Sequence, residues 1–296
     1  MSFRRIVVFG GNGYVGSALV RELVQRGEEV IVGDLNDTRK IAGAEYQCVD
    51  IRDAARVKAI IPEGAIVANF AGIADLNLAK SMPFECLDIN VIGNCNILKA
   101  CVEKSASKFC LASSAYVYSM HGSFYRITKR TCEEYAVEFR RKYGLPFLIL
   151  RYGSLYGGDS NEANGMYRLV MSALRHGRLC YDGHRNDSRE FIHVADASCL
   201  TADLLLGTET NEAYLLTGTD RLTMEQLFAM ISEILNQKIS FEFKEMDDSD
   251  HYRMTQYNFV PINARRLTGN KHIDIGSGLI DLIDRIYVEE KFCSER

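Results

Sequence analysis

The sequence lacks a long apolar segment and a marked excess of one charge. No stretch approaches the ~18 apolar residues of a membrane-spanning helix. The apolar run Ile6–Phe9 stops at Gly10, too early for a signal peptide. The formal net charge of −4 argues against a nucleic-acid surface, which normally carries a basic patch. We therefore expect neither a membrane nor a nucleic acid among the partners of this chain.

Paired cysteines are missing as well. The nine cysteines are an odd number, are scattered along the chain and form no CxxC pair. They match neither a disulfide framework nor a zinc site, so we expect no bound metal. In a reducing compartment cysteine packs as a small hydrophobic residue. This usage predicts a cytoplasmic protein.

The chain does have the length and apolar content for a large core. Its 296 residues are 47% hydrophobic and 25% charged, which is typical of a globular protein with one large domain or two modest ones. The sequence shows no internal repeat, and we expect its charge run, Glu242–Asp250, to be a solvated loop.

A glycine-rich turn stands near the N-terminus. Arg5–Phe9 predicts a buried strand, GGNGYVG follows at once, and a helical pattern then continues to Gly27. Gly10, Gly13 and Gly16 therefore fall between a strand and the start of a helix. There the backbone can approach a pyrophosphate, and free N–H groups stabilise its charge. This pattern predicts a dinucleotide site.

An acid follows at the expected distance. Glu29–Gly33 predicts a second strand, and Asp34 at its end lies eighteen residues after Gly16. A carboxylate there binds ribose hydroxyls and repels a 2′-phosphate, which favours NAD. Arg39 and Lys40 are close enough to leave NADP open as the cofactor. The alternative is that Asp34 is an ordinary loop acid or helix cap.

Strands and helices alternate through the first half, which predicts an α/β fold with a doubly wound parallel (Rossmann) sheet. The further strands are Tyr46–Val49, Ile66–Phe70, Phe109–Ala112 and Pro146–Arg151, with helices at Ala54–Ile60 and about Phe84–Ser105. Such sheets bind ligands at the carboxyl ends of their strands. Gly10, Asp34, Asp50, Ala71 and Ser114 all fall at such ends.

The second half has a looser pattern. It predicts a strand at Arg189–Val194 and helices at Met166–Arg175, Asp196–Leu206, Met224–Leu235 and Asp281–Val288. We expect residues 1–152 to form the dinucleotide-binding domain, with the chain returning to it around 189–207. Residues 153–296 then form mainly a smaller, mixed α/β domain for the substrate.

The segment Cys110–Lys129 carries the candidate chemistry. Ser114 follows an apolar strand, and Tyr125 and Lys129 lie four residues apart, on one face of a predicted helix. A nearby ammonium lowers a phenol pKa, and a serine hydroxyl can hold the oxygen that exchanges the proton. The alternative is that Tyr125 and Lys129 are surface residues of an ordinary amphipathic helix.

Motifs along most of the chain resemble the extended short-chain dehydrogenase/reductase family, in its NAD-dependent nucleotide-sugar epimerase/dehydratase branch. The matching motifs are GGNGYVG at 10–16, DI at 50–51, FAG at 70–72, INVIG at 89–93, SSAYVY at 113–118, YRITK at 125–129, LRYGSLYG at 150–157 and REFIHV at 189–194.

This resemblance implies roles for individual residues. Ser114, Tyr125 and Lys129 take the catalytic positions. The implied cofactor-binding residues are Gly10, Asn12, Gly13, Tyr14, Val15, Gly16, Asp34, Asp50, Ile51, Phe70, Ala71, Gly72, Asn90, Tyr125, Lys129 and Tyr152. The substrate-binding residues are Ser154, Arg189 and Arg253, with Arg189 holding the diphosphate. His193, in the same motif as Arg189, is expected to be structural.

Two departures from the family pattern matter. Ala115-Tyr116 follows Ser114 where the sugar 4,6-dehydratases carry an Asp-Glu pair, so dehydration is not expected. Only eleven residues separate Ser114 from Tyr125, fewer than in many relatives. The trimmed loop predicts a more open pocket or a sugar that is held differently. His121 in this loop either touches the substrate or is simply exposed.

The leading hypothesis is an NAD-dependent nucleotide-sugar epimerase, most simply a 4-epimerase. The rivals are an NAD(P)H-dependent reductase of a nucleotide-linked keto-sugar and a non-catalytic dinucleotide sensor. The base and the sugar are not readable from the sequence. The resemblance also implies a homodimer built from two helices of each chain, for which Leu98, Val102, Tyr135, Ala136 and Phe139 could supply apolar faces.

Overall fold

The computed structural model describes residues 5–36, 40–219, 221–244, 264–269 and 272–294. An eight-stranded sheet with the strand order β13-β10-β6-β5-β4-β1-β2-β3 forms its centre, and every neighbouring pair is parallel. The strands are β1 Arg5–Phe9, β2 Glu29–Asp34, β3 Ala44–Cys48, β4 Ile66–Asn69, β5 Lys108–Ser114, β6 Phe147–Tyr152, β10 Glu212–Leu216 and β13 Arg265–Leu267. The order runs outward from β1 in both directions, so the predicted doubly wound sheet is confirmed.

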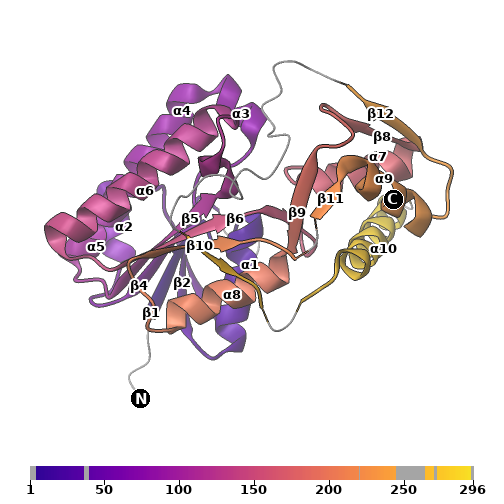
Figure 1. The fold of residues 1–296 in the computed structure, drawn as a ribbon. Coiled ribbons are helices and arrows are strands. Elements are labelled where there is room, and N and C mark those ends of the chain that lie inside the picture. Colours follow the sequence, from indigo (N-terminus) through magenta and orange to yellow (C-terminus); the bar gives the residue numbers. More distant parts are fainter. Residues whose placement is uncertain (1–4, 37–39, 220, 245–263, 270–271, 295–296) are drawn as a thin grey trace.

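Helices cover both faces of this sheet (Figure 1). Helices α1 (Tyr14–Gln25) and α8 (Val194–Leu206) pack on one face, and α2 (Ala54–Ile60), α5 (Asn94–Glu103) and α6 (Ser123–Tyr143) on the other. Because both faces are covered, β4, β5 and β6 are buried at every residue. Burial on both faces explains why these strands have almost continuous apolar sequences.

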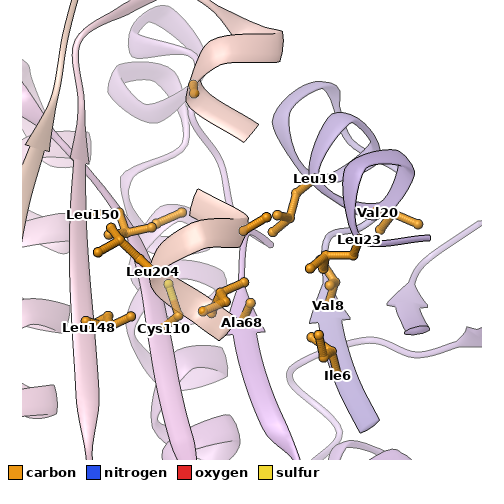
Figure 2. Close-up of a cluster of buried hydrophobic side chains, with 14 of the residues drawn as sticks. Ile6, Val8, Leu19, Val20, Leu23, Ala68, Cys110, Leu148, Leu150 and Leu204 are labelled. Carbon is orange, nitrogen blue, oxygen red and sulfur yellow. The ribbon is translucent and has the colours of Figure 1, made fainter. Parts of the chain in front are cut away.

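The core on the α1 and α8 face of the sheet joins segments that are far apart in the sequence (Figure 2). Leu19 and Leu23 of α1 and Leu204 of α8 lie over Val8 and Leu150 of the sheet, and all five are essentially buried. Burying a leucine side chain stabilises a fold by roughly 1.5–3 kcal/mol. These contacts hold α8, from the second half of the chain, beside α1.

The predicted helix Phe84–Ser105 is wrong in one respect, because it is interrupted. Its parts are α4 (Pro83–Leu87), a π-helical segment η1 (Asp88–Gly93) and α5. A π-helical turn is wider than an α-turn and often marks a functional site. Here it lies against Ile51, since a Cβ added at Gly93 would come within 2.5 Å of that side chain. A short helix α3 (Leu76–Ser81), which the sequence did not predict, precedes it.

The remaining elements form two small sheets and three helices around a third core. The strands are β7 Ser154–Tyr156, β8 Arg178–Tyr181, β9 Ser188–His193, β11 Arg221–Thr223 and β12 Ser240–Phe243, and the helices are α7 Gly165–His176, α9 Met224–Ile234 and α10 Ile275–Ser294. These elements lie at the right of Figure 1. The expected smaller α/β part is therefore present.

Some expectations for the second half need correction. Glu242 lies in β12 instead of a loop, while most of the charge run falls outside the described residues. Helix α10 is longer than the predicted Asp281–Val288. Strands β10 and β13 join the large sheet, so the chain returns to it twice more after α8. The division at residue 152 stays a prediction.

The described ranges contain neither membrane-spanning helices nor groups of metal-binding side chains. None of their helices is both long and apolar enough to cross a bilayer. In the same ranges, no three His, Cys, Asp or Glu side chains are grouped so that they could hold a metal ion.

Candidate active site

The glycine turn between β1 and α1 requires glycine for steric reasons. Gly10 has a φ of +74°, and a Cβ there would lie 2.4 Å from the backbone nitrogen of Ala71. A Cβ at Gly16 would lie 2.1 Å from the carbonyl oxygen of Gly10. No L side chain fits at either position, so the turn stays bare backbone at the start of α1.

Asp34 is held beside this turn. Its carboxylate accepts hydrogen bonds from the backbone N–H of Asn12 at 2.9 Å and of Leu35 at 2.8 Å. The Asn12 side chain donates to the backbone and side-chain oxygens of Asn36. On the other side of the turn, the Tyr14 hydroxyl donates to Gly157 O at 2.9 Å. The strand end and the turn are thus fixed relative to each other.

Asp50 and Ile51 follow β3 along the chain. Arg52 holds the Asp50 carboxylate at 2.6 Å, and this hydrogen bond lowers the pKa of Asp50. Ile51 is buried against Gly93. The predicted contact of these two residues with adenine remains a prediction.

Ser114, Tyr125 and Lys129 come together at the carboxyl end of β5. All three are buried, and the Ser114 hydroxyl lies close enough to the Tyr125 phenol to act on its pKa. The Lys129 ammonium lies 5.8 Å from the centroid of the Tyr125 ring and donates to Ala112 O at 2.8 Å. The residues that the YxxxK spacing placed on one helix face therefore do share one site.

The electrostatics of this group correct one expectation. We expected Lys129 to lower the pKa of Tyr125, but burial dominates and raises the pKa of Tyr125 to about 12, against the opposite effect of the Ser114 hydroxyl. Burial likewise lowers the pKa of Lys129. The cause is the dry setting, which disfavours the charged form of both groups.

Asn90 lies in the π-helical segment and supports the site from behind. Its Oδ1 accepts from the Ile73 N–H at 2.7 Å, and its Nδ2 donates to Ile73 O and to Thr128 Oγ1, both at 3.0 Å. It thereby ties the chain after Gly72 to the residue before Lys129. Asn90 was predicted to bind cofactor, and its amide is engaged within the protein.

Two aromatic side chains that were both predicted to bind the cofactor, Phe70 and Tyr152, lie close together. The ring centroids of Phe70 and Tyr152 are 6.1 Å apart. The Tyr152 hydroxyl pairs with Thr201 Oγ1 of α8 at 2.7 Å. The Tyr152 ring thus lies between the strand end and α8, with its polar tip satisfied.

The predicted substrate residues lie on neighbouring strands. Ser154 of β7 pairs in register with Phe191 of β9, two residues beyond Arg189. Arg189 is buried and donates to Tyr181 Oη at 2.9 Å. Arg253 lies outside the described residues.

Several polar residues near these sites were not predicted from the sequence. On the substrate side, Arg221 of β11 donates to Ser188 Oγ at 3.0 Å, next to Arg189. Arg151 forms a buried ion pair with Glu133, which lies on the same helix as Tyr125 and Lys129. The sequence does hint at Glu133, because it follows Lys129 by one helical turn and so shares its helix face.

The two histidines differ in setting. His193 Nδ1 accepts from the Ala195 N–H at 3.2 Å and caps α8, and a Cβ at Gly157 would meet its ring at 2.0 Å. Burial lowers its pKa. This is a structural role, as expected. His121 is exposed in the short loop before α6.

A comparison with models of protein families identifies the family of this chain. The model described as the NAD dependent epimerase/dehydratase family matches residues 6–214. The chain belongs to this family. The resemblance drawn from the motifs is therefore confirmed.

Named members and solved structures match nearly the whole chain. The UDP-glucose 4-epimerase of Rhizobium meliloti is 25% identical over 296 residues, 87% of this chain and 90% of that protein. A crystal structure of the UDP-glucose 4-epimerase from Thermotoga maritima with UDP-glucose has a TM-score of 0.84 and 22% identity, covering 97% of this chain and 99% of that one.

A dehydratase is similarly close. The dTDP-glucose 4,6-dehydratase DesIV from Streptomyces venezuelae, with NAD and TYD bound, has a TM-score of 0.82 and 22% identity over 97% of this chain and 98% of that one. At these identities the structures establish a shared fold. The epimerase/dehydratase family thus contains more than one reaction, and the choice between them depends on individual residues.

Proposed function

We propose that this member of the family is an NAD-dependent nucleotide-sugar epimerase, most simply a 4-epimerase that works through a transient 4-keto sugar. The observation that carries the proposal is the buried group of Ser114, Tyr125 and Lys129 at the end of β5. The glycine turn and Asp34 end β1 and β2 at the same edge of the sheet, where such folds bind ligands.

The residues of the turn fit NAD. Gly10 and Gly16 leave backbone where a side chain would block a pyrophosphate, and Asp34 is oriented by two backbone N–H groups. A carboxylate there suits the hydroxyls of an unphosphorylated ribose, which favours NAD over NADP. When bound, NAD supplies a reversible hydride acceptor for the sugar carbon.

Tyr125 moves the proton in this scheme. As the phenolate, it accepts the proton of the sugar hydroxyl while the carbon that bears this hydroxyl gives up its hydride, and it returns the proton after the keto sugar has rotated. Ser114 holds the sugar oxygen by hydrogen bonding. Lys129 stabilises the phenolate and binds the nicotinamide ribose. Nothing is consumed, because the proton and the hydride both return to the sugar.

The residues after Ser114 favour an epimerase over a dehydratase. Ala115 is buried, and the Tyr116 ring stands edge-on to Tyr125, with centroids 6.3 Å apart and an interplanar angle of 76°. Elimination of water needs an acid and a base at the neighbouring carbons. Ala115 and Tyr116 stand where a dehydratase has two carboxyl groups, and neither provides a carboxylate.

We also propose that the nucleoside diphosphate of the substrate lies along β7 and β9. Arg189 offers a guanidinium fork that suits phosphate oxygens, and Ser154 offers a hydroxyl from the adjacent strand. Arg253 stays part of the proposal as a second diphosphate contact.

Of the residues predicted for the homodimer, Tyr135 is exposed and stays available, while two others are not. Leu98 and Ala136 are buried in the core of their own chain, so they cannot form an interface. The exposed apolar residues on α4, η1 and α6 include Phe84 at 82%, Ile92 at 49% and Ile127 at 49% relative accessibility. A second copy packed on this surface would cover them. In a sedimentation experiment we expect wild type to behave as a dimer and Phe84→Glu to behave as a monomer.

We keep the cytoplasm as the proposed compartment. The eight cysteines in the described ranges are free thiols, as a reducing environment would leave them.

The deciding experiment begins with protein purified without added nucleotide, then denatured to identify what it releases. Released NAD supports the epimerase, and the next assay is interconversion of nucleotide-sugar pairs, beginning with UDP-glucose and UDP-galactose. NADP, or an empty protein that binds NADPH reversibly, favours a keto-sugar reductase. An empty protein that binds neither dinucleotide contradicts both enzymes and leaves the proposal wrong.

A further inference from the structure

A buried ion pair lies directly behind the candidate catalytic group. Glu133 of α6 and Arg151 of β6 have side chains only 8% and 6% exposed. Arg151 Nε donates to Glu133 Oε1 at 2.9 Å, and Arg151 Nη2 donates to Oε2 at 2.7 Å. The pair therefore fastens helix α6 to the carboxyl end of a central strand in a bidentate geometry.

The same pair holds the chain on both sides of Ser114. Ser113 Oγ donates to Glu133 Oε1 at 2.5 Å. Arg151 Nη1 donates to Tyr118 Oη at 2.9 Å, and its guanidinium lies 4.8 Å from the centre of that ring. Ser113 and Arg151 are also register partners in the sheet. Ser114 therefore stands in a short segment whose two ends are attached to one ion pair.

The negative charge of Glu133 also lies near the positive charge of Lys129. The two residues are four apart on α6, which places them on one face about 6 Å apart along the helix axis. The titratable groups around Lys129 are Cys86 of α4 and Tyr125, Cys132 and Glu133 of α6. Burial lowers the pKa of Lys129, while Cys132, Cys86 and, to a smaller extent, Glu133 act in the opposite direction.

We propose that the Glu133–Arg151 ion pair is a positioning device for the active site. It fixes α6 against β5 and β6 so that Ser114 meets Tyr125, and it places a carboxylate one helical turn from Lys129. Glu133 and Arg151 act through Ser114 and Lys129 without touching the substrate. The proposal rests on the function proposed above, in which these residues perform the chemistry.

Stability alone is a weak explanation for such a pair. Desolvation of two charges offsets much of their attraction, and apolar residues of similar volume often stabilise a core equally well. A purely structural pair could therefore be replaced by apolar residues without loss of function. A positioning pair could not.

The first test measures the protonation of Lys129 directly. Protein labelled with ¹³C at lysine Cε is titrated by NMR, with Lys129→Met to assign the signal. Glu133→Gln keeps the size of the side chain and removes its charge. Glu138→Gln is the matched control, since Glu138 pairs with Arg141 at 2.6 Å on the exposed face of the same helix.

We expect Glu133→Gln to lower the Lys129 pKa, because it removes a negative charge and leaves Arg151 uncompensated. The alkaline limb of the pH–kcat profile should move to lower pH by the same amount, and Glu138→Gln should change neither. A Lys129 pKa that is equal in both variants contradicts the proposal.

The second test separates positioning from folding. In Glu133→Leu/Arg151→Met both charges are removed together, so no charge is left unpaired in the core. We expect a Tm within a few degrees of wild type and a kcat at least about tenfold lower, since small displacements of catalytic groups are costly. A double variant with full kcat would overturn the proposal.

The two proposals fail in different ways. If wild type turns over no nucleotide sugar but Lys129 titrates as expected, the proposed function falls and the electrostatic part of the inference stands. If wild type is an active epimerase and Glu133→Gln leaves Lys129 unchanged, the inference falls and the function stands.

Discussion

Lys129 donates to the carbonyl oxygen of Ala112 at 2.8 Å, and its ammonium lies 5.8 Å from the centre of the Tyr125 ring. The ammonium is thus anchored to strand β5 and lies near the phenol. Such an anchor fixes the position of the charge but does not by itself ionise the tyrosine. Burial of the phenol outweighs its other interactions.

Tyr125→Phe should remove turnover and spare cofactor binding. The phenol is the proposed proton carrier, and general acid–base groups contribute about 10²–10⁴-fold to rate. We expect kcat to fall by about that factor, with an unchanged amount of NAD in the purified protein. Loss of NAD together with turnover would show that the variant damages the site as a whole.

The pKa of Tyr125 gives a prediction of its own. Burial raises it to about 12 in the protein alone. A cationic nicotinamide ring bound beside the phenol favours phenolate, so NAD should lower this pKa and NADH should not. The measurement is an ultraviolet titration at the tyrosinate absorption, as the difference between wild type and Tyr125→Phe. Equal curves with NAD and NADH would contradict this reading.

Lys129→Met should stabilise the fold while it abolishes activity. Burial lowers the folded pKa of Lys129 below its ordinary value in the unfolded chain, so the folded state binds fewer protons than the unfolded state between the two values. The unfolding free energy of wild type therefore rises with pH in that window. The Tm advantage of Lys129→Met should be largest near pH 7 and should shrink toward pH 10. Lys99→Met, at an exposed position of α5, should show no such trend.

Much of this organisation was readable from the sequence because it depends on local rules. The run Arg5–Phe9, the glycines after it and the acid at Asp34 are set by strand, turn and helix-start chemistry. The spacing of Tyr125 and Lys129 is set by helix geometry. The fold and the grouping of these two residues with Ser114 followed from such rules.

What the sequence did not reveal depends on contacts between distant segments. Strand β10 is only five residues long, and pairing with β6 places it in the large sheet. The π-helical turn at Asp88–Gly93 carries Asn90, which accepts a hydrogen bond from the Ile73 N–H. The raised pKa of Tyr125 is a consequence of its burial. None of these causes is visible in a local pattern.

Gly16→Ala should abolish dinucleotide binding without a general loss of fold. The added Cβ would lie 2.1 Å from Gly10 O, so the turn must move away from the start of α1. Gly165→Ala is the matched control, because its Cβ would meet only the end of Arg168, at 3.9 Å. NADH fluorescence titration should show binding for the control and none for Gly16→Ala. Normal affinity in Gly16→Ala would contradict the proposed cofactor site.

Lys108 at the start of β5 should be a strong determinant of stability, independent of the reaction. Its buried ammonium donates to the carbonyl oxygens of Leu204, Leu205 and Gly207 at 3.0, 3.2 and 3.0 Å, and so caps the end of α8. Lys108→Met leaves these carbonyls without their donor, which should cost about 2–4 kcal/mol of unfolding free energy. Urea denaturation measures this loss, with Lys99→Met as the exposed control. Because α8 packs beside α1 over the core of the sheet, the loss should appear as a single cooperative transition at lower urea. A separate early transition would instead show that α8 detaches on its own.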